Sequence, residues 1–358
     1  MNSPAVTTGI TLGDYTTLRL GGPAARMIAC RTSDELIEAV RACDDAGEPV
    51  LLLGGGSNLV IGDAGFEGTV VRIATRGERT QRGDAEVRVD VAAGEDWDRF
   101  VARTVDAGFG GLECLSGIPG QVGATPIQNV GAYGWETAQF LRAVEVCDRT
   151  TGKVSTLRPA ELGLAYRTSR FKGTNTAIVL TVSFGLHHDG LSQPVRYAEL
   201  ARTLGVRLGT RLPAGEVRAA VLGLRRGKGM VLDSDDHDTW SAGSFFTNPI
   251  IGDDRIGEVL ERIAAQVGPD VAAPPQYPAE GGVKLSAAWL IERAGFSKGH
   301  RGPGGRVALS GKHTLALTNR GAASTADLLA LAREVRAGVV TRFGITLHPE
   351  PLLINCTL

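Results

Sequence analysis

Apolar residues recur at every third or fourth position between Thr325 and Phe343, which is the spacing of an amphipathic helix. Ser324 precedes this segment as an N-cap candidate, and Gly344 follows it where a glycine often ends a helix. The same spacing predicts helices from Asp96 to Ala107 and from Ala214 to Arg226. Three helices are therefore indicated by periodicity alone.

A further helix and a strand are predicted near the N-terminus. Ser33 is its N-cap candidate, acidic residues follow in the first turn, and Gly47 ends it. The apolar run Val50–Leu53 then reads as a buried strand. Further strands are expected around Val87–Val91, Val144, Val154 and Ala177–Phe184. This mixture of helices and strands predicts an α+β fold in several layers.

Length and composition fit a globular protein of two or three domains, because the chain has 358 residues with 43% hydrophobic and 22% charged residues. Lys and Arg number 38 and Asp and Glu 39, so no global field favours nucleic acid or an anionic membrane. The polar, acidic stretch Gly227–Thr239 is a candidate domain boundary.

No targeting segment or metal site is expected. Met1–Tyr15 lacks the basic start and apolar run of a signal peptide, and no apolar stretch approaches the ~18 residues of a membrane span. The five cysteines have no Cys-x-x-Cys spacing, and the six histidines have no metal-ligand spacing. We therefore expect a soluble, cytoplasmic protein with reduced thiols and without a bound metal.

Glycine is the unusual feature, with 48 residues, and its clusters suggest chemistry. Gly54–Asn58 follows a predicted strand, and consecutive glycines let backbone N–H groups converge on a phosphate. The run matches neither the dinucleotide fingerprint nor the Walker loop. A tight turn between packed elements would need the same glycines, so both interpretations remain open.

A second cluster, Gly117–Gly134, is long, uncharged and rich in backbone donors. A segment of this kind either packs inside the protein or lies against a flat, partly apolar ligand. A flavin with its pyrophosphate fits the second interpretation, while a buried structural loop fits the first.

Three further segments contain groups that could act on a small anion. Tyr166–Lys172 holds arginines able to grip a carboxylate or phosphate, or it forms a solvated basic strand edge. Ser244 lies between a glycine and two phenylalanines, where it is either a shielded proton donor or an ordinary strand-end serine. Glu350 stands between two prolines, either as a positioned carboxylate or as a surface residue in a turn.

Together these segments resemble the UDP-N-acetylenolpyruvoylglucosamine reductases, the flavoenzymes of peptidoglycan precursor synthesis. The matching motifs occur in the family's order and span nearly the whole chain. They are Thr17–Gly22, Leu53–Val60, Ser116–Glu136, Tyr166–Lys172, Gly243–Pro249, Lys284–Glu292 and Phe343–Glu350.

The resemblance implies a fold and a domain division. It indicates an α+β protein with an FAD-binding fold of the vanillyl-alcohol-oxidase (PCMH) type in two subdomains, followed by a C-terminal α+β substrate-binding domain. The first subdomain is expected over residues 1–75, with the strand region 345–358 returning to the site. The second is expected over residues 76–228, and the substrate-binding domain over residues 229–344.

The resemblance also implies the reaction. NADPH reduces FAD, a hydride passes to the β-carbon of the enolpyruvyl group of UDP-N-acetylglucosamine enolpyruvate, and a proton reaches the α-carbon to give UDP-N-acetylmuramate. Ser244 matches the family's proton donor, and Arg167 and Glu350 match the pair that polarises the substrate carboxylate and stabilises the enolate. The expected partner is a small UDP-sugar. Neither nucleic acid nor a membrane is expected to bind, and a monomer is expected.

Binding residues are carried over in the same way. The residues that match FAD contacts are Leu53, Gly54, Gly55, Gly56, Ser57, Asn58, Leu59, Ser116, Pro119, Gly120, Gly123, Ala124, Asn129 and Gly131. Those that match substrate contacts are Tyr133, Tyr197, Lys228, Asn248 and Lys284. Tyr197 resembles the tyrosine that closes over the UDP-sugar in type I members.

Two departures and two other functions remain to be considered. Many relatives have an arginine where this chain has Leu352, and Gly299–Gly305 is longer and richer in glycine than usual.

Another FAD oxidoreductase of this fold, for example an oxidase of a sugar or hydroxy acid, would share the glycine clusters without needing Arg167, Ser244 and Glu350. A non-catalytic UDP-sugar-binding protein is the other alternative, and the intact catalytic set argues against it.

Overall fold

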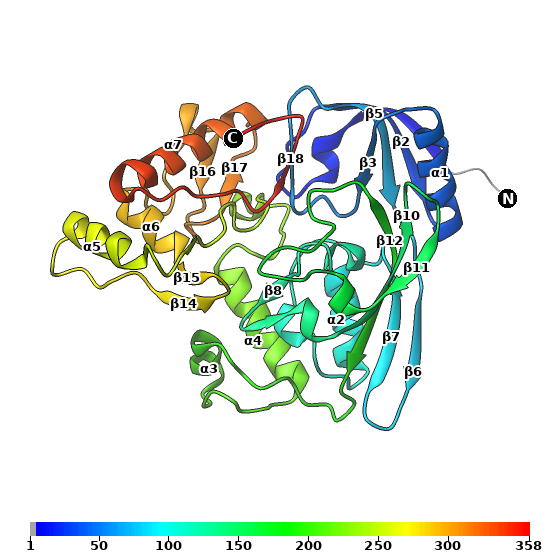
Figure 1. Cartoon of the computed structure of the whole chain (residues 1–358), viewed down its shortest axis with the longest axis horizontal. Coiled ribbons are helices and arrows are strands. Elements are labelled where there is room, and N and C mark those ends of the chain that lie inside the picture. Colours follow the sequence, from blue (N-terminus) through cyan, green and yellow to red (C-terminus); the bar gives the residue numbers. More distant parts are fainter. Residues whose placement is uncertain (1–4) are drawn as a thin grey trace. The chain divides into compact units, whose positions relative to one another are not determined.

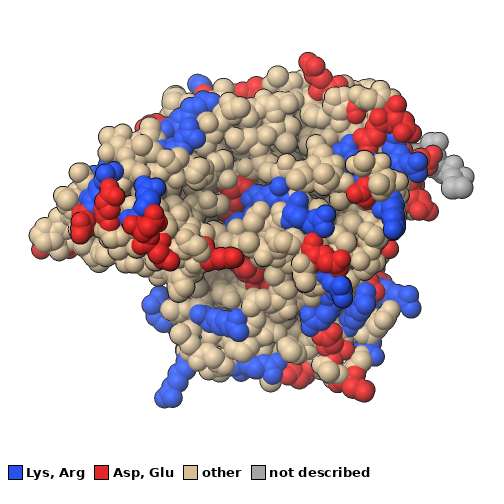
Figure 2. All heavy atoms as spheres, viewed as in Figure 1, with Lys and Arg blue, Asp and Glu red and all other residues tan. Residues whose placement is uncertain are grey.

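The structure is a computed structural model that describes residues 5–358 (Figure 1). The chain forms two compact units. The first takes its described residues from Met1–Thr11, Pro23–Gly56 and Phe66–Val231, and the second comprises Leu12–Gly22, Ser57–Gly65 and Leu232–Leu358. Basic and acidic side chains are interspersed over the face drawn in Figure 2. Within residues 5–358, no helix is both long enough and apolar enough to cross a bilayer.

The first unit begins with a four-stranded sheet in the order β1-β2-β5-β3. Its strands are β1 (Ala5–Thr11), β2 (Pro23–Cys30), β3 (Val50–Leu53) and β5 (Phe66–Ile73). β1 is antiparallel to β2, whereas β2, β5 and β3 are parallel. Helix α1 (Ser33–Asp45) provides the crossover from β2 to β3, and its Leu36 and Val40 pack against Val71 of the sheet.

Helix α1 begins one residue earlier than the predicted cap implied. Thr32 is the N-cap, and its hydroxyl accepts a hydrogen bond from the Glu35 N–H at 3.2 Å. Ser33 is the first helical residue, so the N-cap prediction was wrong by one position. The predicted end is confirmed, since Gly47 has a φ of 66° directly after the helix.

A second sheet of the first unit is antiparallel throughout, in the order β11-β10-β12-β7-β6. Its strands are β6 (Glu78–Arg82), β7 (Val87–Ala92), β10 (Leu141–Asp148), β11 (Val154–Leu157) and β12 (Ala177–Leu186). The helices of this region are α2 (Trp97–Asp106), α3 (Ala198–Leu204) and α4 (Ala214–Gly227). The predicted strands and the helices from Asp96 and Ala214 are therefore present.

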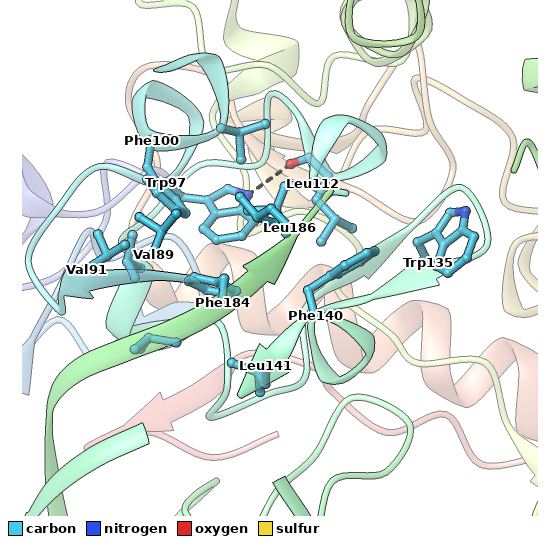
Figure 3. Packing of buried hydrophobic residues seen from close by; sticks show 14 of the residues in the cluster. Val89, Val91, Trp97, Phe100, Leu112, Trp135, Phe140, Leu141, Phe184 and Leu186 are labelled. Carbon is cyan, nitrogen blue, oxygen red and sulfur yellow. Dashed lines mark hydrogen bonds between the residues drawn. The ribbon is translucent and has the colours of Figure 1, made fainter. Parts of the chain in front are cut away.

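The core against this sheet is built on aromatic rings (Figure 3). Trp97 and Phe100 of α2 pack against Phe184 of β12, with ring centroids 5.5 to 6.0 Å apart. The Trp97 indole N–H donates a hydrogen bond to the Leu115 carbonyl at 2.9 Å. This bond fixes the backbone immediately before the second glycine cluster.

The second unit is built around the long helix α7 (Thr325–Phe343), which carries the predicted apolar face. Ser324 and Asp327 form a capping box at its start, and Gly344, with a φ of 70°, ends it. The carboxylate of Asp63 also accepts hydrogen bonds from the N–H groups of Thr325 and Ala326, at 2.7 and 2.9 Å.

Shorter elements complete the second unit. They are β4 (Leu59–Ile61), β13 (Ile250–Ile251), α5 (Ile256–Val267), β14 (Gln276–Ala279), β15 (Gly282–Leu285), α6 (Ala287–Arg293), β16 (Val307–Leu309), β17 (Leu317–Asn319) and β18 (Leu352–Ile354). β18 pairs in parallel with β4, so residues from both halves of the chain form one small sheet. Single 3-10 turns lie at Leu12–Tyr15, Glu113–Leu115, Val122–Ala124, Thr137–Gln139, Pro159–Glu161, His237–Thr239 and Pro303–Gly305.

Candidate active site

The two glycine clusters meet in the first unit. A Cβ atom on Gly55 would lie 2.8 Å from the Gly120 Cα, and one on Gly54 would lie 3.0 Å from the amide oxygen of Gln121. Approach this close between two backbones is possible only where both sides lack bulk. Gly55 and Gly120 are 65 residues apart in the chain, yet their segments pack against each other and form one surface lined by glycine.

This surface fits a flavin dinucleotide. The Gln121 side chain donates to the Ile73 carbonyl at 3.0 Å, but its amide oxygen is buried and has no hydrogen-bond partner. A buried acceptor of this kind requires a donor, and a dinucleotide cofactor offers several hydroxyl and N–H groups. The glycines supply room for the cofactor, and Gln121 supplies an acceptor beside them.

The second cluster is not a surface loop, which confirms the prediction that it does not lie free in solvent. From Ser116 to Tyr133 every residue is buried or half-buried. The Gly120 carbonyl accepts from the Trp97 N–H at 3.1 Å, and the Gly117 N–H donates to the Asp98 carboxylate at 2.6 Å. The segment is thereby fastened to the first turn of α2.

Arg167 is brought to the end of that segment. Its guanidinium donates to the carbonyl of Gly131 at 2.7 Å and to the carbonyl of Asn129 at 3.5 Å. The Asn129 amide is itself held by Glu136 at 2.9 Å and by the Ala165 carbonyl at 3.1 Å. These contacts join the basic motif to the glycine segment, and they leave the Arg167 side chain half-buried and hydrogen-bonded.

Tyr133, Tyr197 and Lys228 lie near one another in the first unit. Tyr133 is the first residue at the tip of the hairpin between β8 (Gly131–Ala132) and β9 (Trp135–Glu136). Its ring meets that of Tyr197 edge to face, with centroids 5.5 Å apart. Burial raises the pKa of Tyr133 to about 12, so its hydroxyl stays protonated. Lys228 forms an ion pair with Glu199, two residues after Tyr197.

Ser244 and Glu350 lie on adjacent segments of the second unit. Glu350 donates its N–H to the carbonyl of Phe245 at 2.9 Å, and Phe246 bridges to Pro349. Ser244 is half-buried, while both phenylalanines after it are 1% exposed. The Asn58 amide reaches the Glu350 carbonyl at 3.5 Å, and the Leu352 N–H donates to the Asn58 carbonyl at 3.0 Å. Asn58 therefore supports the backbone around Glu350.

Asn248 and Lys284 are also neighbours in the second unit. Lys284 on β15 pairs with Ile250 on β13, and the Leu285 N–H donates to the Pro249 carbonyl at 2.9 Å. The Asn248 side-chain oxygen accepts from the Ala287 N–H at 2.9 Å, at the start of α6. The side-chain oxygen of Asn248 is thus already hydrogen-bonded within the protein.

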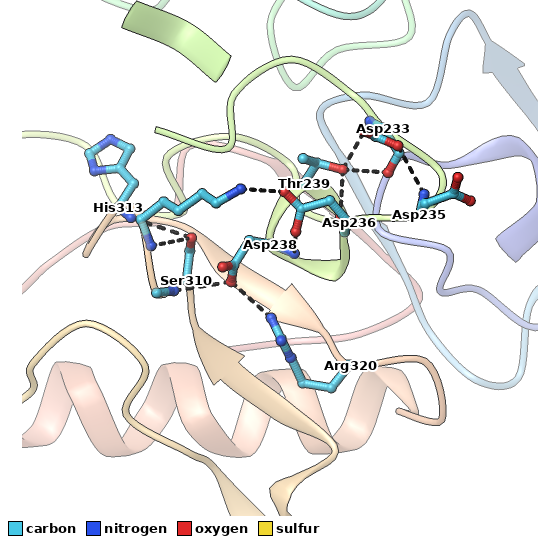
Figure 4. Close-up of polar contacts among 10 residues, drawn as sticks. Asp233, Asp235, Asp236, Asp238, Thr239, Ser310, His313 and Arg320 are labelled. Carbon is cyan, nitrogen blue, oxygen red and sulfur yellow. Dashed lines mark hydrogen bonds and ion pairs between the residues drawn. The ribbon is translucent and has the colours of Figure 1, made fainter. Parts of the chain in front are cut away.

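An acidic loop holds the chain that leads to Ser244 (Figure 4). Asp236 forms an ion pair with Lys312, and Asp238 accepts from Arg320 at 2.8 Å and from the Gly311 N–H at 3.0 Å. Beyond this loop, the Trp240 carbonyl accepts from the Asn319 N–H at 3.0 Å. The loop ties the segment before Ser244 to the β16–β17 hairpin.

Arg225 and Gln121 were missed by the sequence reasoning. The Nε of Arg225 is buried without a partner, a Cβ on Gly117 would lie 3.4 Å from it, and the same guanidinium donates to the Met230 carbonyl at 2.7 Å. Burial lowers the pKa of Arg225 to about 10, which leaves it charged at neutral pH. Its position in the last turn of an amphipathic helix gave no signal. Gln121 could have been noticed as a polar side chain within the glycine-rich segment.

The two departures from the family pattern are local. Leu352 starts the three-residue strand β18, where it pairs with Leu59. In the glycine-rich stretch, a Cβ on Gly302 would lie 2.7 Å from Val307, and His300 contacts Glu334 at 3.0 Å. This stretch is therefore packed and hydrogen-bonded within the second unit.

The candidate residues are distributed over both units. Arg167, Tyr133, Tyr197, Lys228 and the glycines up to Gly56 belong to the first unit. Ser57, Asn58 and Leu59 belong to the second, together with Ser244, Asn248, Lys284 and Glu350. The first glycine cluster is the point at which the chain passes from one unit to the other.

Known proteins of one function are similar to this chain over nearly its whole length. A family model described as an FAD binding domain matches residues 24–158, and one described as the C-terminal domain of UDP-N-acetylenolpyruvoylglucosamine reductase matches residues 235–354. A UDP-N-acetylenolpyruvoylglucosamine reductase of Saccharopolyspora erythraea is 62% identical over 98% of this chain and 96% of its own. One of Thermobifida fusca is 58% identical over 98% of both chains. The crystal structure of the reductase from Thermus caldophilus matches with a TM-score of 0.65 and 27% identity, over 98% of this chain and 99% of that chain.

Proposed function

The chain belongs to the UDP-N-acetylenolpyruvoylglucosamine reductase family, and from this premise we propose how its own residues divide the work of the reaction. The chain is an oxidoreductase that reduces the enolpyruvyl group of UDP-N-acetylglucosamine enolpyruvate to give UDP-N-acetylmuramate for peptidoglycan synthesis. The predicted fold class and the FAD cofactor are confirmed, and NADPH is the electron donor of the family. FAD, when bound, supplies hydride transfer from NADPH to the β-carbon of the double bond.

Arg167 and Glu350 are proposed to stabilise the charge that develops on the substrate. Hydride addition at the β-carbon leaves an enolate next to the carboxylate, and a planar guanidinium can grip such an anion with two hydrogen bonds. The observation that carries this role is the anchoring of the Arg167 guanidinium to the Gly131 carbonyl at 2.7 Å. A cation held in place before charge develops stabilises the transition state without reorganisation.

Ser244 is proposed as the donor of the proton that reaches the α-carbon. A serine hydroxyl is a weak acid, but an enolate carbon is strongly basic, so position matters more than a low pKa. The buried phenylalanines after Ser244 and the hydrogen bond between Glu350 and Phe245 fix its backbone. Both features support a positioned hydroxyl.

The binding roles are likewise proposed by residue. For FAD we assign Leu53, Gly54, Gly55, Gly56, Ser57, Asn58, Leu59, Ser116, Pro119, Gly120, Gly123, Ala124, Asn129 and Gly131. For the UDP-sugar we assign Tyr133, Tyr197, Lys228, Asn248 and Lys284. Ser116 and Asn129 act through the backbone they fix, because the Ser116 hydroxyl donates to the Glu113 carbonyl at 2.7 Å and the Asn129 amide is held by Glu136 and Ala165.

The domain division is proposed as residues 1–75 and 76–228 for the FAD-binding subdomains and 229–344 for the substrate-binding domain, with 345–358 returning to the site. The separate sheets β1-β2-β5-β3 and β11-β10-β12-β7-β6 support the first boundary. We also propose that the protein is a cytoplasmic monomer that binds neither nucleic acid nor membranes, as its net charge of -1 suggests.

The role of Ser244 is tested by separating the two half-reactions of Ser244→Ala. Flavin reduction by NADPH should stay close to the wild-type rate, while reoxidation by the enolpyruvyl substrate should slow about 10²-fold or more, because a positioned general acid has been removed. Stopped-flow absorbance of the FAD-loaded protein measures both steps. The matched control is Ser234→Ala in the exposed acidic loop, which should leave both rates unchanged. Equal slowing of both steps would contradict a proton-donor role.

A further inference from the structure

Lys228 is paired with an acidic residue that has no assigned role. Its ammonium contacts the Glu199 carboxylate, and the two side chains are 34% and 32% exposed. Lys228 is the C-cap of α4, and Glu199 lies in the first turn of α3. The pair therefore links the ends of two helices at a half-exposed position that a ligand can reach.

The same pair is connected to the tyrosines of the site. Tyr197 is the N-cap of α3, directly before the turn that carries Glu199. Its ring packs edge to face on Tyr133. The charges of Arg225 and Glu199 both affect the pKa of Tyr133, so these groups lie close to its hydroxyl. Tyr197 and Glu199 are therefore fixed to each other by the short backbone at the start of α3.

We propose that Glu199 is an affinity-setting residue that occupies Lys228 until the diphosphate of the nucleotide-sugar displaces it. This inference rests on the proposed role of Lys228 as a substrate ligand. A diphosphate oxygen that approaches the Lys228 ammonium meets the Glu199 carboxylate at the same nitrogen. The two anions repel each other, so binding requires Glu199 to withdraw.

The size of the effect follows from the exposure of the pair. A half-exposed ion pair contributes little free energy. Its loss corresponds to about a two- to five-fold change in the Kd of the ligand. Glu199 therefore weakens binding modestly. Only a ligand with a strong anionic centre displaces Glu199 and pairs with the Lys228 ammonium. A neutral sugar would not compete for it.

The test is a double-mutant cycle on the FAD-loaded, oxidised protein. Titration calorimetry would measure the Kd of UDP-N-acetylmuramate for wild type, Glu199→Gln, Lys228→Met and the double variant. We expect Glu199→Gln to bind about two- to five-fold tighter. In the Lys228→Met background the same change should have no effect, because no ammonium remains to be released.

Asp189→Asn is the matched control. It removes one negative charge from the same unit by breaking the ion pair of Asp189 with Arg211, so it measures the general electrostatic effect. If Glu199→Gln weakens binding, or tightens it no more than Asp189→Asn does, the proposal is wrong. A thermal unfolding curve of each FAD-loaded variant shows whether the fold is intact, and Glu199→Asp provides a second, shorter carboxylate that should bind between wild type and Glu199→Gln.

The outcomes also separate this inference from the role of Lys228. If Lys228→Met binds the UDP-sugar as tightly as wild type, Lys228 is not a substrate ligand, and both ideas fail. If Lys228→Met weakens binding but Glu199→Gln does not strengthen it, Lys228 keeps its role and only the displacement of Glu199 is wrong.

Discussion

At the scale of single residues, three candidate site residues have backbones in the left-handed region. Asn129, Tyr133 and Arg167 have φ values of 45°, 51° and 56°. This region is disfavoured for residues with a Cβ, and it persists where the surroundings fix it. The hydrogen bonds from Arg167 to Gly131 and from Asn129 to Glu136 provide that fixation. The left-handed backbone at Arg167 thus directs its guanidinium toward the Gly131 carbonyl, which an extended strand would not do.

The first prediction at this scale is that Arg167→Lys retains charge but loses function. Lysine has no planar fork, so it cannot hold the Gly131 carbonyl and a substrate carboxylate in the same way. We expect flavin reoxidation by the enolpyruvyl substrate to slow about 10²-fold, the loss typical of removing a preorganised donor. Stopped-flow absorbance on the FAD-loaded protein measures this step.

Arg170→Lys is the control from the same motif. The exposed Arg170 side chain donates to the Glu161 carbonyl at 3.3 Å, away from the glycine segment, and it should tolerate the exchange with an unchanged rate. A wild-type rate in Arg167→Lys would show that charge alone suffices and that the fork geometry is not used.

At the scale of elements, regular helices followed from the sequence and irregular contacts did not. The face of α7, its cap Ser324 and its end at Gly344 were predicted, because the signals lie within one helix. At α1, Thr32 and Ser33 both have a hydroxyl suited to capping, and only the backbone distinguishes them. The pairing of β4 with β18 joins residues nearly 300 positions apart in strands of three residues, which are too short for a periodic signal.

The candidate site shows the same limit. Composition alone suggested that Gly54–Asn58 and Gly117–Gly134 bind a flat, phosphate-bearing ligand. It could not reveal that Gly55 packs on Gly120, or that the Gln121 oxygen and the Arg225 Nε are buried without partners. These facts depend on packing between distant segments. The roles proposed for Ser244, Arg167 and Glu350 came from family resemblance, since each alone has an ordinary structural interpretation.

The prediction at this scale concerns the capping box of α7. Hydrogen bonds from Arg306 and from the Ser324 N–H hold the pKa of Asp327 well below its usual range. A lowered folded-state pKa contributes stability above the unfolded pKa near 4, and this contribution is lost as the pH falls through the folded pKa. Asp327→Asn should therefore reduce the free energy of unfolding at pH 7 by about 1 kcal/mol.

Urea unfolding of the FAD-loaded protein at pH 7 and at pH 4 checks this sign. The difference between wild type and Asp327→Asn should shrink at the lower pH, where the carboxylate begins to protonate in the unfolded chain but not in the folded one. Asp235→Asn in the exposed acidic loop is the control and should change stability little at either pH. A difference that grows on acidification would contradict the assigned cause.

At the scale of the whole molecule, local charge and cofactor binding explain what the composition does not. The net charge is -1 and the signs are interspersed on the face drawn in Figure 2, so no overall field guides an anionic substrate. In the proposed site the cations are few and each has a partner, the Gly131 carbonyl for Arg167 and the Glu199 carboxylate for Lys228. The glycines serve a second global purpose, because a cofactor that binds only the folded chain stabilises all of it.

That coupling gives the last prediction, for Gly55→Ala. The φ of Gly55 is not in the left-handed region, so an alanine can adopt its backbone; the obstacle is a Cβ 2.8 Å from the Gly120 Cα. The two glycine segments must then move apart, which disturbs the surface that holds FAD. At a hundred-fold excess over Kd a ligand adds about 2.7 kcal/mol to the free energy of unfolding, so weaker binding lowers that gain.

Thermal unfolding with and without added FAD measures this gain. The FAD-dependent rise in the unfolding temperature should be smaller for Gly55→Ala than for wild type. Gly223→Ala is the matched control, because nothing lies within 4 Å of its added Cβ on helix α4, and it should keep the wild-type rise. An equal rise in Gly55→Ala would show that the contact between the clusters does not shape the cofactor site.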